Sequence, residues 1–273
     1  MTFAARLVNN ANDPALVPFR FRERQLNTRP HRRGDLDGAQ FVAEGDLVVM
    51  RALASGYKAA TILCGAEQLA SLEPYATQLQ HTDVVVADES VRREATGLGV
   101  ALSIIGLFLR PPLASLNDVS SRHTKIILLS QIDNPTNVGA IMRSAMAFGF
   151  HGVLLDGETS DPFGRRALRV SMGTSFAADI CRTTDVSDAL SLLHNEGFVS
   201  CALTPHHDAT PLIEVTAPEK LVLLLGSERD GLADSLLSSA TLRVRIAMSE
   251  GIDSLNVAAA AAVACYGLTS RNG

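Results

Sequence analysis

The chain contains 273 residues, 47% of them apolar, and carries a net charge of −5. This is long for one compact domain, and the apolar content is enough for hydrophobic cores, so we expect two domains. No apolar run is long enough to cross a bilayer, and none near the N-terminus has the flanks of a signal peptide, so we expect a cytoplasmic protein. The four cysteines form no C-x-x-C pair or His/Cys cluster, which predicts buried free thiols and no metal site.

The first 110 residues begin with weak periodicity and then alternate between strand and helix patterns. We expect one or two short helices in residues 1–35 and a mobile segment around 28–38. Strand and helix then alternate over 40–43, 44–55, 59–63, 66–78, 84–87, 90–96 and 103–109, beginning and ending with a strand. Such alternation predicts a small α/β domain.

An arginine-rich arm lies near the N-terminus, although the total charge is negative. Between residues 20 and 33, only Glu23 offsets a cluster made of Arg20, Arg22, Arg24, Arg29, Arg32 and Arg33. Arginines can neutralise phosphates and stack on unpaired bases, which predicts an RNA contact. A solvated helix face followed by a flexible turn explains the same composition equally well.

The second half of the chain repeats strand and helix patterns. Pro111, Pro112 and the polar run 115–123 indicate a linker, which gives domains at 1–110 and 123–273 and a linker at 111–122. Strands are predicted at 125–129, 152–155, 179–182, 198–203, 221–225 and 242–246, with helices at 137–148, 187–195 and 254–266. Repeated βα units imply a mostly parallel sheet with helices on both faces and ligands at the carboxyl ends of its strands.

Three stretches of this half differ from ordinary globular sequence. Residues 137–143 read N-x-G-x-x-x-R, and residues 226–232, directly after a buried strand, read G-x-E-x-x-G-L. The third stretch starts at Ile246 and continues through S-L-N-V at 254–257 into an alanine-rich helix, whose N-cap we expect at residue 253 or 254.

Together these stretches resemble the three motifs of the SpoU (TrmH-like) branch of the SPOUT RNA methyltransferases. They occur in the family's order, and the resemblance covers about residues 123–270. Ala247 replaces the proline expected after Ile246, which removes a backbone stiffener but no chemical group. The resemblance implies a SPOUT domain with a C-terminal trefoil knot. Residues 41–45 also resemble the opening of the small RNA-binding domain often fused to such enzymes, which is similar to ribosomal RNA binders.

The resemblance implies a reaction. S-adenosylmethionine would donate a methyl group to a ribose 2′-hydroxyl of structured RNA, with ribosomal RNA favoured over transfer RNA because of the N-terminal domain. Such a transfer needs alignment and removal of a proton rather than a metal ion. Within the family pattern, the cofactor is held by Thr204, Gly226, Ile246, Met248 and Leu255.

The resemblance also assigns catalytic residues. Arg143 lies at the acceptor, and because a guanidinium stays protonated, we expect it to bind a phosphate and polarise the hydroxyl while phosphate or water takes the proton. Asn137 would position Arg143 or the ribose, and Glu228 would orient Arg143 or a backbone amide. Ser254 and Asn256 would line the cofactor and acceptor side. Arg143 is expected to reach a cofactor in a partner subunit, which implies a homodimer.

Plainer interpretations exist for these residues. Arg143 is also consistent with an ordinary surface helix, Glu228 with a solubilising strand end, and Ser254 and Asn256 with helix caps. The pair at 206–207 is more typical of exposed loop histidines and receives no role.

A second arginine group lies in the second half of the chain. Arg165, with Arg166 and Arg169, either binds RNA or solvates a helix, and we favour RNA because these residues follow a loop near the expected cleft.

Two other classes of function remain to be compared with the enzyme. A non-catalytic RNA-binding or ribosome-assembly protein on the same fold is the main alternative, although such a protein would be free to lose the motif residues. A dehydrogenase-like enzyme is disfavoured, because neither G-x-G-x-x-G after a strand nor a P-loop is present.

Overall fold

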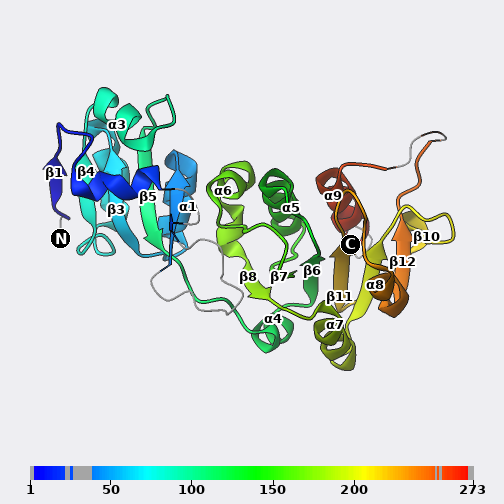
Figure 1. Ribbon diagram of the computed structural model, residues 1–273. Coiled ribbons are helices and arrows are strands. Elements are labelled where there is room, and N and C mark those ends of the chain that lie inside the picture. The colour runs from blue at the N-terminus through cyan, green and yellow to red at the C-terminus, as the bar shows by residue number, and fades with distance from the viewer. Residues whose placement is uncertain (1–2, 22–24, 27–38, 250, 252–253, 270–273) are drawn as a thin grey trace. The chain divides into compact units, whose positions relative to one another are not determined.

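Figure 1 shows the computed structural model, which describes residues 3–21, 25–26, 39–249, 251 and 254–269. The chain forms two compact units, each described here by itself. The N-terminal unit contains Met1–Pro112 and Phe163–Phe176, and the C-terminal unit contains Leu113–Pro162 and Ala177–Gly273. The predicted mobile segment and five arginines of the predicted arm, Arg22, Arg24, Arg29, Arg32 and Arg33, lie outside the described residues.

The N-terminal unit is built on a five-stranded sheet in the order β1-β4-β3-β5-β2. Its strands are β1 (Ala5–Leu7), β2 (Gln40–Glu44), β3 (Ala59–Cys64), β4 (Asp83–Val86) and β5 (Ile104–Leu109). β4 pairs in parallel with β1 and β3, whereas β5 pairs antiparallel with β2 and β3. The sheet is therefore mixed, and β1 was not predicted from the sequence.

Short helices connect these strands. They are η1 (Pro14–Arg20), α1 (Asp46–Ala54), η3 (Ala66–Gln68), α2 (Leu69–Leu72), η4 (Glu73–Tyr75) and α3 (Glu89–Thr96). The single helix predicted at 66–78 is wrong, because this region consists of one α-helical turn between two 3-10 turns. Pro74, at the start of η4, cannot donate the backbone hydrogen bond that a continuous helix needs there.

The segment 163–176 of the C-terminal half packs inside the N-terminal unit. It contains α6 (Arg165–Ser171) and most of η5 (Thr174–Ala177). Phe163 and Phe176 lie 5.1 and 5.5 Å from Phe41 between ring centroids, and Tyr57 lies 5.0 Å from Phe176. The predicted division of the chain into two domains at a single linker is therefore wrong for residues 163–176. Contacts between aromatic residues that are far apart in the sequence place this segment in the N-terminal unit.

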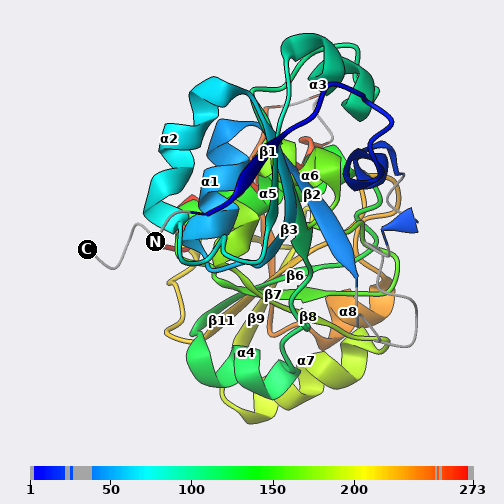
Figure 2. The same cartoon turned by 90° about the vertical axis from the view of Figure 1, so that its left-hand side faces the viewer.

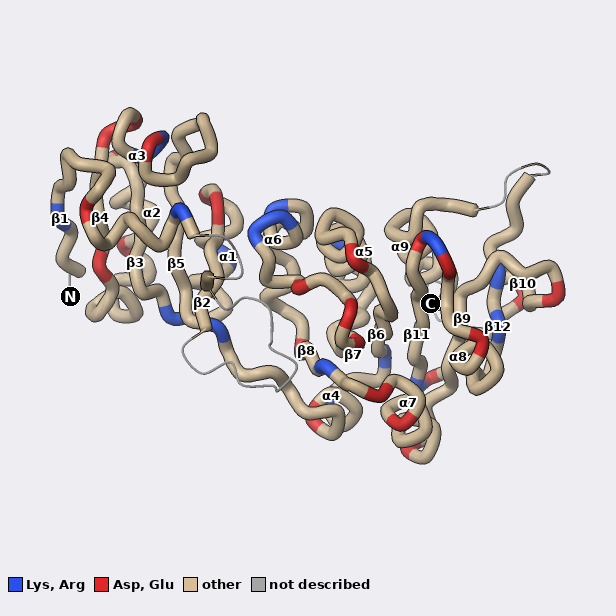
Figure 3. Tube along the Cα trace, viewed as in Figure 1, with Lys and Arg blue, Asp and Glu red and all other residues tan. Residues whose placement is uncertain are grey.

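The arginines of α6 (Figure 3) meet a buried carboxylate in the same unit. Glu44 ends β2 with its side chain only 3% exposed, and its Oε1 lies 2.6 Å from Arg165 Nη2. Arg169 pairs with the other carboxylate oxygen, and Arg165 also donates to the Phe19 carbonyl at 3.1 Å. The structure thus gives Arg165 a partner inside the protein, which disfavours its predicted RNA contact.

The C-terminal unit is built on a seven-stranded sheet in the order β10-β12-β9-β11-β6-β7-β8. The strands are β6 (Lys125–Leu129), β7 (Gly152–Leu155), β8 (Asp179–Arg182), β9 (Val199–Leu203), β10 (Thr210–Pro211), β11 (Leu221–Leu225) and β12 (Leu242–Arg245). All the strand pairings described for it are parallel. The predicted parallel sheet is confirmed, and the all-apolar run of β11 is buried along its whole length.

Helices cover both faces of this sheet (Figure 2). They are α4 (Leu116–Arg122), α5 (Pro135–Ala147), α7 (Val186–Asn195), α8 (Asp234–Ser239) and α9 (Val257–Gly267), with the 3-10 turn η6 (Leu212–Glu214). α4, α7 and α8 pack on one face through a common apolar core, and α5 and α9 pack together on the other. No described helix is long and apolar enough to span a membrane. The knot implied by the family resemblance stays a prediction.

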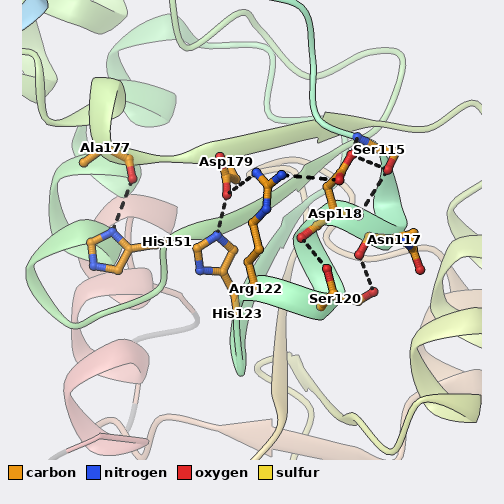
Figure 4. Close-up of polar contacts among 10 residues, drawn as sticks. Ser115, Asn117, Asp118, Ser120, Arg122, His123, His151, Ala177 and Asp179 are labelled. Carbon is orange, nitrogen blue, oxygen red and sulfur yellow. Dashed lines mark hydrogen bonds and ion pairs between the residues drawn. The ribbon is translucent and has the colours of Figure 1, made fainter. Parts of the chain in front are cut away.

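The polar run predicted as a linker forms a helix instead. Ser115 and Asp118 make a capping box, in which the Ser115 hydroxyl accepts from the Asp118 amide and the Asp118 carboxylate accepts from the Ser115 amide. Val119 is buried, and His123 Nε2 lies 2.9 Å from Asp179 Oδ2 (Figure 4). The predicted linker at 111–122 is therefore wrong from residue 113 onward, since its polar residues cap and anchor α4.

Replacing Glu44 with Ala should destabilise the N-terminal unit by about 3–5 kcal/mol, because Arg165 and Arg169 lose their shared buried carboxylate. Urea denaturation measures this difference. Asp83→Ala is the matched control: its side chain is 39% exposed and pairs with the exposed Arg6, so we expect a loss of about 1 kcal/mol or less. An equal loss of unfolding free energy in the two variants would contradict a structural role for the cluster of Glu44, Arg165 and Arg169.

Candidate functional site

A cavity of about 320 Å³, here called the first cavity, opens at the carboxyl ends of three adjacent strands. Thr204 follows β9, Gly226 follows β11 and Ile246 follows β12, and all three line it. Met248 and Leu255, from the connection between β12 and α9, complete the set. The five residues predicted to hold a cofactor thus lie around one space of the size that small ligands occupy. Their contact with a cofactor stays a prediction.

The loop after β11 is a tight turn that permits no side chain at its first position. Ser227 and Gly231 exchange backbone hydrogen bonds of 3.1 and 3.0 Å, and the Asp230 amide donates to the Ser227 hydroxyl. Gly231 has a φ of +70°, which favours glycine. A Cβ atom on Gly226 would lie 2.2 Å from the carbonyl carbon of Gly231, so the loop can close only over a glycine.

Asn256 links two of the predicted catalytic residues. Its Nδ2 donates to Glu228 Oε1 at 2.9 Å and to Asn137 Oδ1 at 3.2 Å. Its Oδ1 accepts from the amides of Ala258 and Ala259, so Asn256 is the N-cap of α9. The N-cap predicted at residue 253 or 254 is wrong, because α9 begins at Val257 and the side chain of Asn256 caps its first amides.

Asn137 and Ser254 are two further residues with a predicted role in catalysis. Asn137, in the first turn of α5, is only 6% exposed, and among the described residues its Nδ2 has no hydrogen-bond partner. A buried donor without a partner indicates that something else fills the position. Ser254 is exposed and lines the first cavity.

A second cavity of about 630 Å³ shares a wall with the first. Both are lined by residues 227–230, and the second is completed by Gln131, Asp133, Asn134, Pro135 and Glu158. Asn134 is the N-cap of α5, since its Oδ1 accepts from the Thr136 amide at 2.9 Å. An occupant of the second cavity therefore lies beside an occupant of the first, next to the start of α5.

The thiols near the site are not nucleophiles. Burial raises the pKa of Cys265 in α9 to about 12, and it does the same for Cys201 in β9. A thiol with such a pKa stays protonated at neutral pH. Among the described residues, no three or more metal-ligating side chains gather at one place.

The profile of the SpoU rRNA methylase family matches residues 124–266 of this chain. A Mycobacterium bovis relative, named as an uncharacterized tRNA/rRNA methyltransferase, is 34% identical over 264 residues, which are 95% of this chain and 90% of the relative. The chain belongs to the SpoU rRNA methylase family. The family predicted from the three motifs is thereby confirmed, and with it the class of RNA methyltransferases.

Two further similarities concern activity and fold. The 23S rRNA (guanosine(2553)-2′-O)-methyltransferase of Bacillus subtilis is 31% identical over 144 residues, 53% of this chain and 57% of that enzyme. The structure of an AdoMet-bound rRNA methyltransferase from Sinorhizobium meliloti has a TM-score of 0.77 at 24% identity and covers 97% of both chains. This second likeness shows that the fold is shared.

Arg143 takes no part in the network of Asn137, Asn256 and Glu228. It is exposed on α5, lines neither cavity and makes no polar side-chain contact with a described residue. Arg143 lies six residues beyond Asn137 on α5, which places it about 9 Å further along the helix axis and about 120° around it. The two side chains therefore point in different directions. Within one chain, Asn137 and Glu228 therefore contact Asn256 and not Arg143.

Sequence reasoning missed several lining residues, and three of them are polar side chains that closely follow strands. Gln131 and Glu158 line the second cavity, and His206, which received no role, lines the first. A signal was available for all three: each follows a strand of the parallel sheet within three residues, where ligands gather.

Replacing Gly226 with Ala should weaken binding of S-adenosylmethionine about tenfold or more, a loss of about 1.4 kcal/mol or more, because the new methyl group displaces the 227–231 turn. Calorimetric titration measures the dissociation constant. Gly157→Ala is the control, since a Cβ there meets no atom within 4 Å. Unchanged binding in Gly226→Ala would contradict the assignment of the first cavity.

Proposed function

We propose that this SpoU family chain transfers a methyl group from S-adenosylmethionine to a ribose 2′-hydroxyl of structured RNA, and that ribosomal RNA is its substrate. One observation carries the proposal. The five motif residues expected at a cofactor line one cavity, and the Asn137–Asn256–Glu228 network lies at its edge. The 2′-O activity named for the Bacillus subtilis relative supports the reaction type. Such an enzyme acts on RNA in the cytoplasm.

The first cavity suits the cofactor. Ile246, Met248 and Leu255 offer apolar contact, and Gly226 lines the cavity without a side chain. Asn137, whose Nδ2 has no partner among the described residues, is linked through Asn256 to Glu228 in the wall of this cavity. When bound, S-adenosylmethionine supplies the activated methyl group, so the protein has only to align the acceptor.

The second cavity suits the acceptor nucleotide, because it shares residues 227–230 with the first. Asn256 holds Glu228 at the shared wall, and Asn137 positions the ribose from the start of α5. Ser254 lines the cofactor side. Arg143 binds the phosphate next to the acceptor and polarises the hydroxyl, whose proton passes to phosphate or water.

A homodimer brings Arg143 to a site. On its own chain this residue lies away from both cavities, so the cofactor that it serves belongs to a partner. Val263 and Tyr266, 43% and 59% exposed on α9, form with the neighbouring α5 an apolar face suited to a second copy of the chain.

Binding of the RNA extends to the N-terminal unit. Arginines neutralise phosphates without reading sequence, a role that we assign to Arg22, Arg24, Arg29, Arg32 and Arg33. Arg165 contributes indirectly, since it pairs with Glu44.

Methyl transfer from labelled S-adenosylmethionine to total RNA tests the activity. We expect label in ribosomal RNA, at a nucleotide whose 3′ linkage resists alkali, and a loss of about 100-fold or more in Arg143→Ala. Retained cofactor binding in Arg143→Ala is the control. If the wild-type protein transfers no label to any RNA and binds no cofactor, it is a non-catalytic RNA-binding protein; label in transfer RNA alone overturns the choice of substrate.

Mixed dimers test whether Arg143 acts across the subunit boundary. At a cofactor concentration too low to fill the Gly226→Ala cavity, Arg143→Ala and Gly226→Ala chains each have little activity alone. One site of a mixed dimer, however, combines an intact cofactor cavity with an intact Arg143. Random mixing should restore about a quarter of wild-type activity. No recovery on mixing, with mixed dimers present by mass spectrometry, would show that Arg143 acts within its own chain.

A further inference from the structure

We propose that Asp156 is a positioning residue for methyl transfer, which fixes the wall of the second cavity and the start of α5. The inference rests on the proposed function, because it concerns the acceptor side of that reaction. Asp156 directly follows β7, is only 8% exposed and lines neither cavity. Its effect on the reaction therefore passes through the residues that it holds.

Strand register brings Asp156 to the site. Leu155, Leu129 and Leu225 pair across β7, β6 and β11, so the residues that follow them emerge at one edge of the sheet. Backbone hydrogen bonds continue past the strands there, from the Asp156 amide to the Leu129 carbonyl and from the Ser130 amide to the Leu225 carbonyl. The carboxylate of Asp156 thus lies beside the segment that leads from β6 to α5.

Both oxygens of the Asp156 carboxylate are used. Oδ2 accepts from the Ser130 hydroxyl at 3.1 Å and from the Gln131 amide at 2.8 Å. Oδ1 accepts from the amides of Glu158 and Thr159 at 3.1 and 2.7 Å. One buried group therefore binds the two segments, 130–131 and 158–159, that supply Gln131 and Glu158 to the second cavity.

Gln131 has a backbone conformation that needs such support. Its φ of 59° lies in the left-handed region. A residue with a side chain has a higher free energy in this conformation, so surrounding contacts must stabilise it. The hydrogen bond from its amide to Asp156 supplies that hold, and the turn sends the chain toward Asn134 and the first turn of α5. A change in this turn would move Asn137 relative to Glu228.

Neighbouring contacts reinforce the arrangement. The Thr159 hydroxyl donates to the Leu129 carbonyl at 3.1 Å and accepts from the Ile132 amide at 3.2 Å, while the Ser160 amide donates to the Ile132 carbonyl. Arg182 Nη1 donates to the carbonyls of Asp156 and Thr159. Replacement of Asp156 alone thus leaves the loop after β7 attached through these other hydrogen bonds. The variant should therefore fold, but with the wall of the second cavity displaced.

Asp156→Asn tests the inference, because an amide presents an NH₂ group to one of the two pairs of donors. In steady-state methyl transfer, kcat should fall between about tenfold and a hundredfold, because a small misplacement of the acceptor side slows the reaction by this much. The dissociation constant of S-adenosylmethionine should stay within about twofold of wild type. Asp179→Asn is the control. It loses a carboxylate that contacts Arg122 and His123 at the amino end of the neighbouring strand β8, and its kcat should be unchanged.

A second pair of variants guards against misfolding. Thr159→Ser keeps the hydroxyl and should retain kcat, whereas Thr159→Val loses both hydrogen bonds and should lower kcat in the same direction as Asp156→Asn. An unchanged kcat in Asp156→Asn, or parallel loss of kcat, cofactor binding and thermal stability in both Asp156→Asn and Thr159→Val, would overturn the inference.

Hydrogen exchange separates this inference from the proposed function. In Asp156→Asn, the amides of residues 130–137 should exchange faster, while those of 226–232 should not change. If the wild-type protein transfers no methyl group, the proposed function fails, yet this readout still tests whether Asp156 positions the segment. Unchanged exchange of 130–137 contradicts the inference whatever the activity.

Discussion

The site depends on the parallel register of the C-terminal sheet. Val244 pairs with Leu203, Leu224 with Ala202, and Leu225 with Leu129, so the loops after β12, β9, β11 and β6 start at one edge. Parallel strands need long crossovers, which is why residues from 131 to 256 converge there although the sequence separates them widely. A shift of one residue in any of these strands would exchange the faces of its side chains and displace the loop that follows it from this edge.

Polar side chains then give this edge its shape. Asn256 joins α9 to α5 and to the loop after β11, and Asp156 joins the loops after β6 and β7. Each side chain makes two hydrogen bonds to residues two or three positions away and two to residues distant in sequence. The apolar sheet therefore holds the strands, while these side chains fix the loops. Within the part of the chain that the structure describes, the buried Nδ2 of Asn137 has no hydrogen-bond partner.

Local patterns predicted most strands and the motif residues, because a buried parallel strand reads as an apolar run and a tight turn requires glycine. They did not predict that 163–176 belongs to the N-terminal unit, because Phe41 and Phe163 are separated by 122 positions and no periodicity encodes their contact. The local patterns also indicated that residues 115–122 belong to a linker. Its serine and aspartate are equally typical of a loop and of a capping box, and only the burial of Val119 decides between them.

The same limit applies to Arg143. Its position in N-x-G-x-x-x-R predicts function, but helix geometry directs Asn137 toward the network of Asn256 and Arg143 away from it. A single chain therefore contains a pocket, a positioned amide and a carboxylate, whereas Arg143 is exposed elsewhere on α5. If Arg143 takes part in the reaction, association of two chains is a requirement of the chemistry rather than an addition to it. The exposed Val263 and Tyr266 on the neighbouring helix are consistent with that requirement.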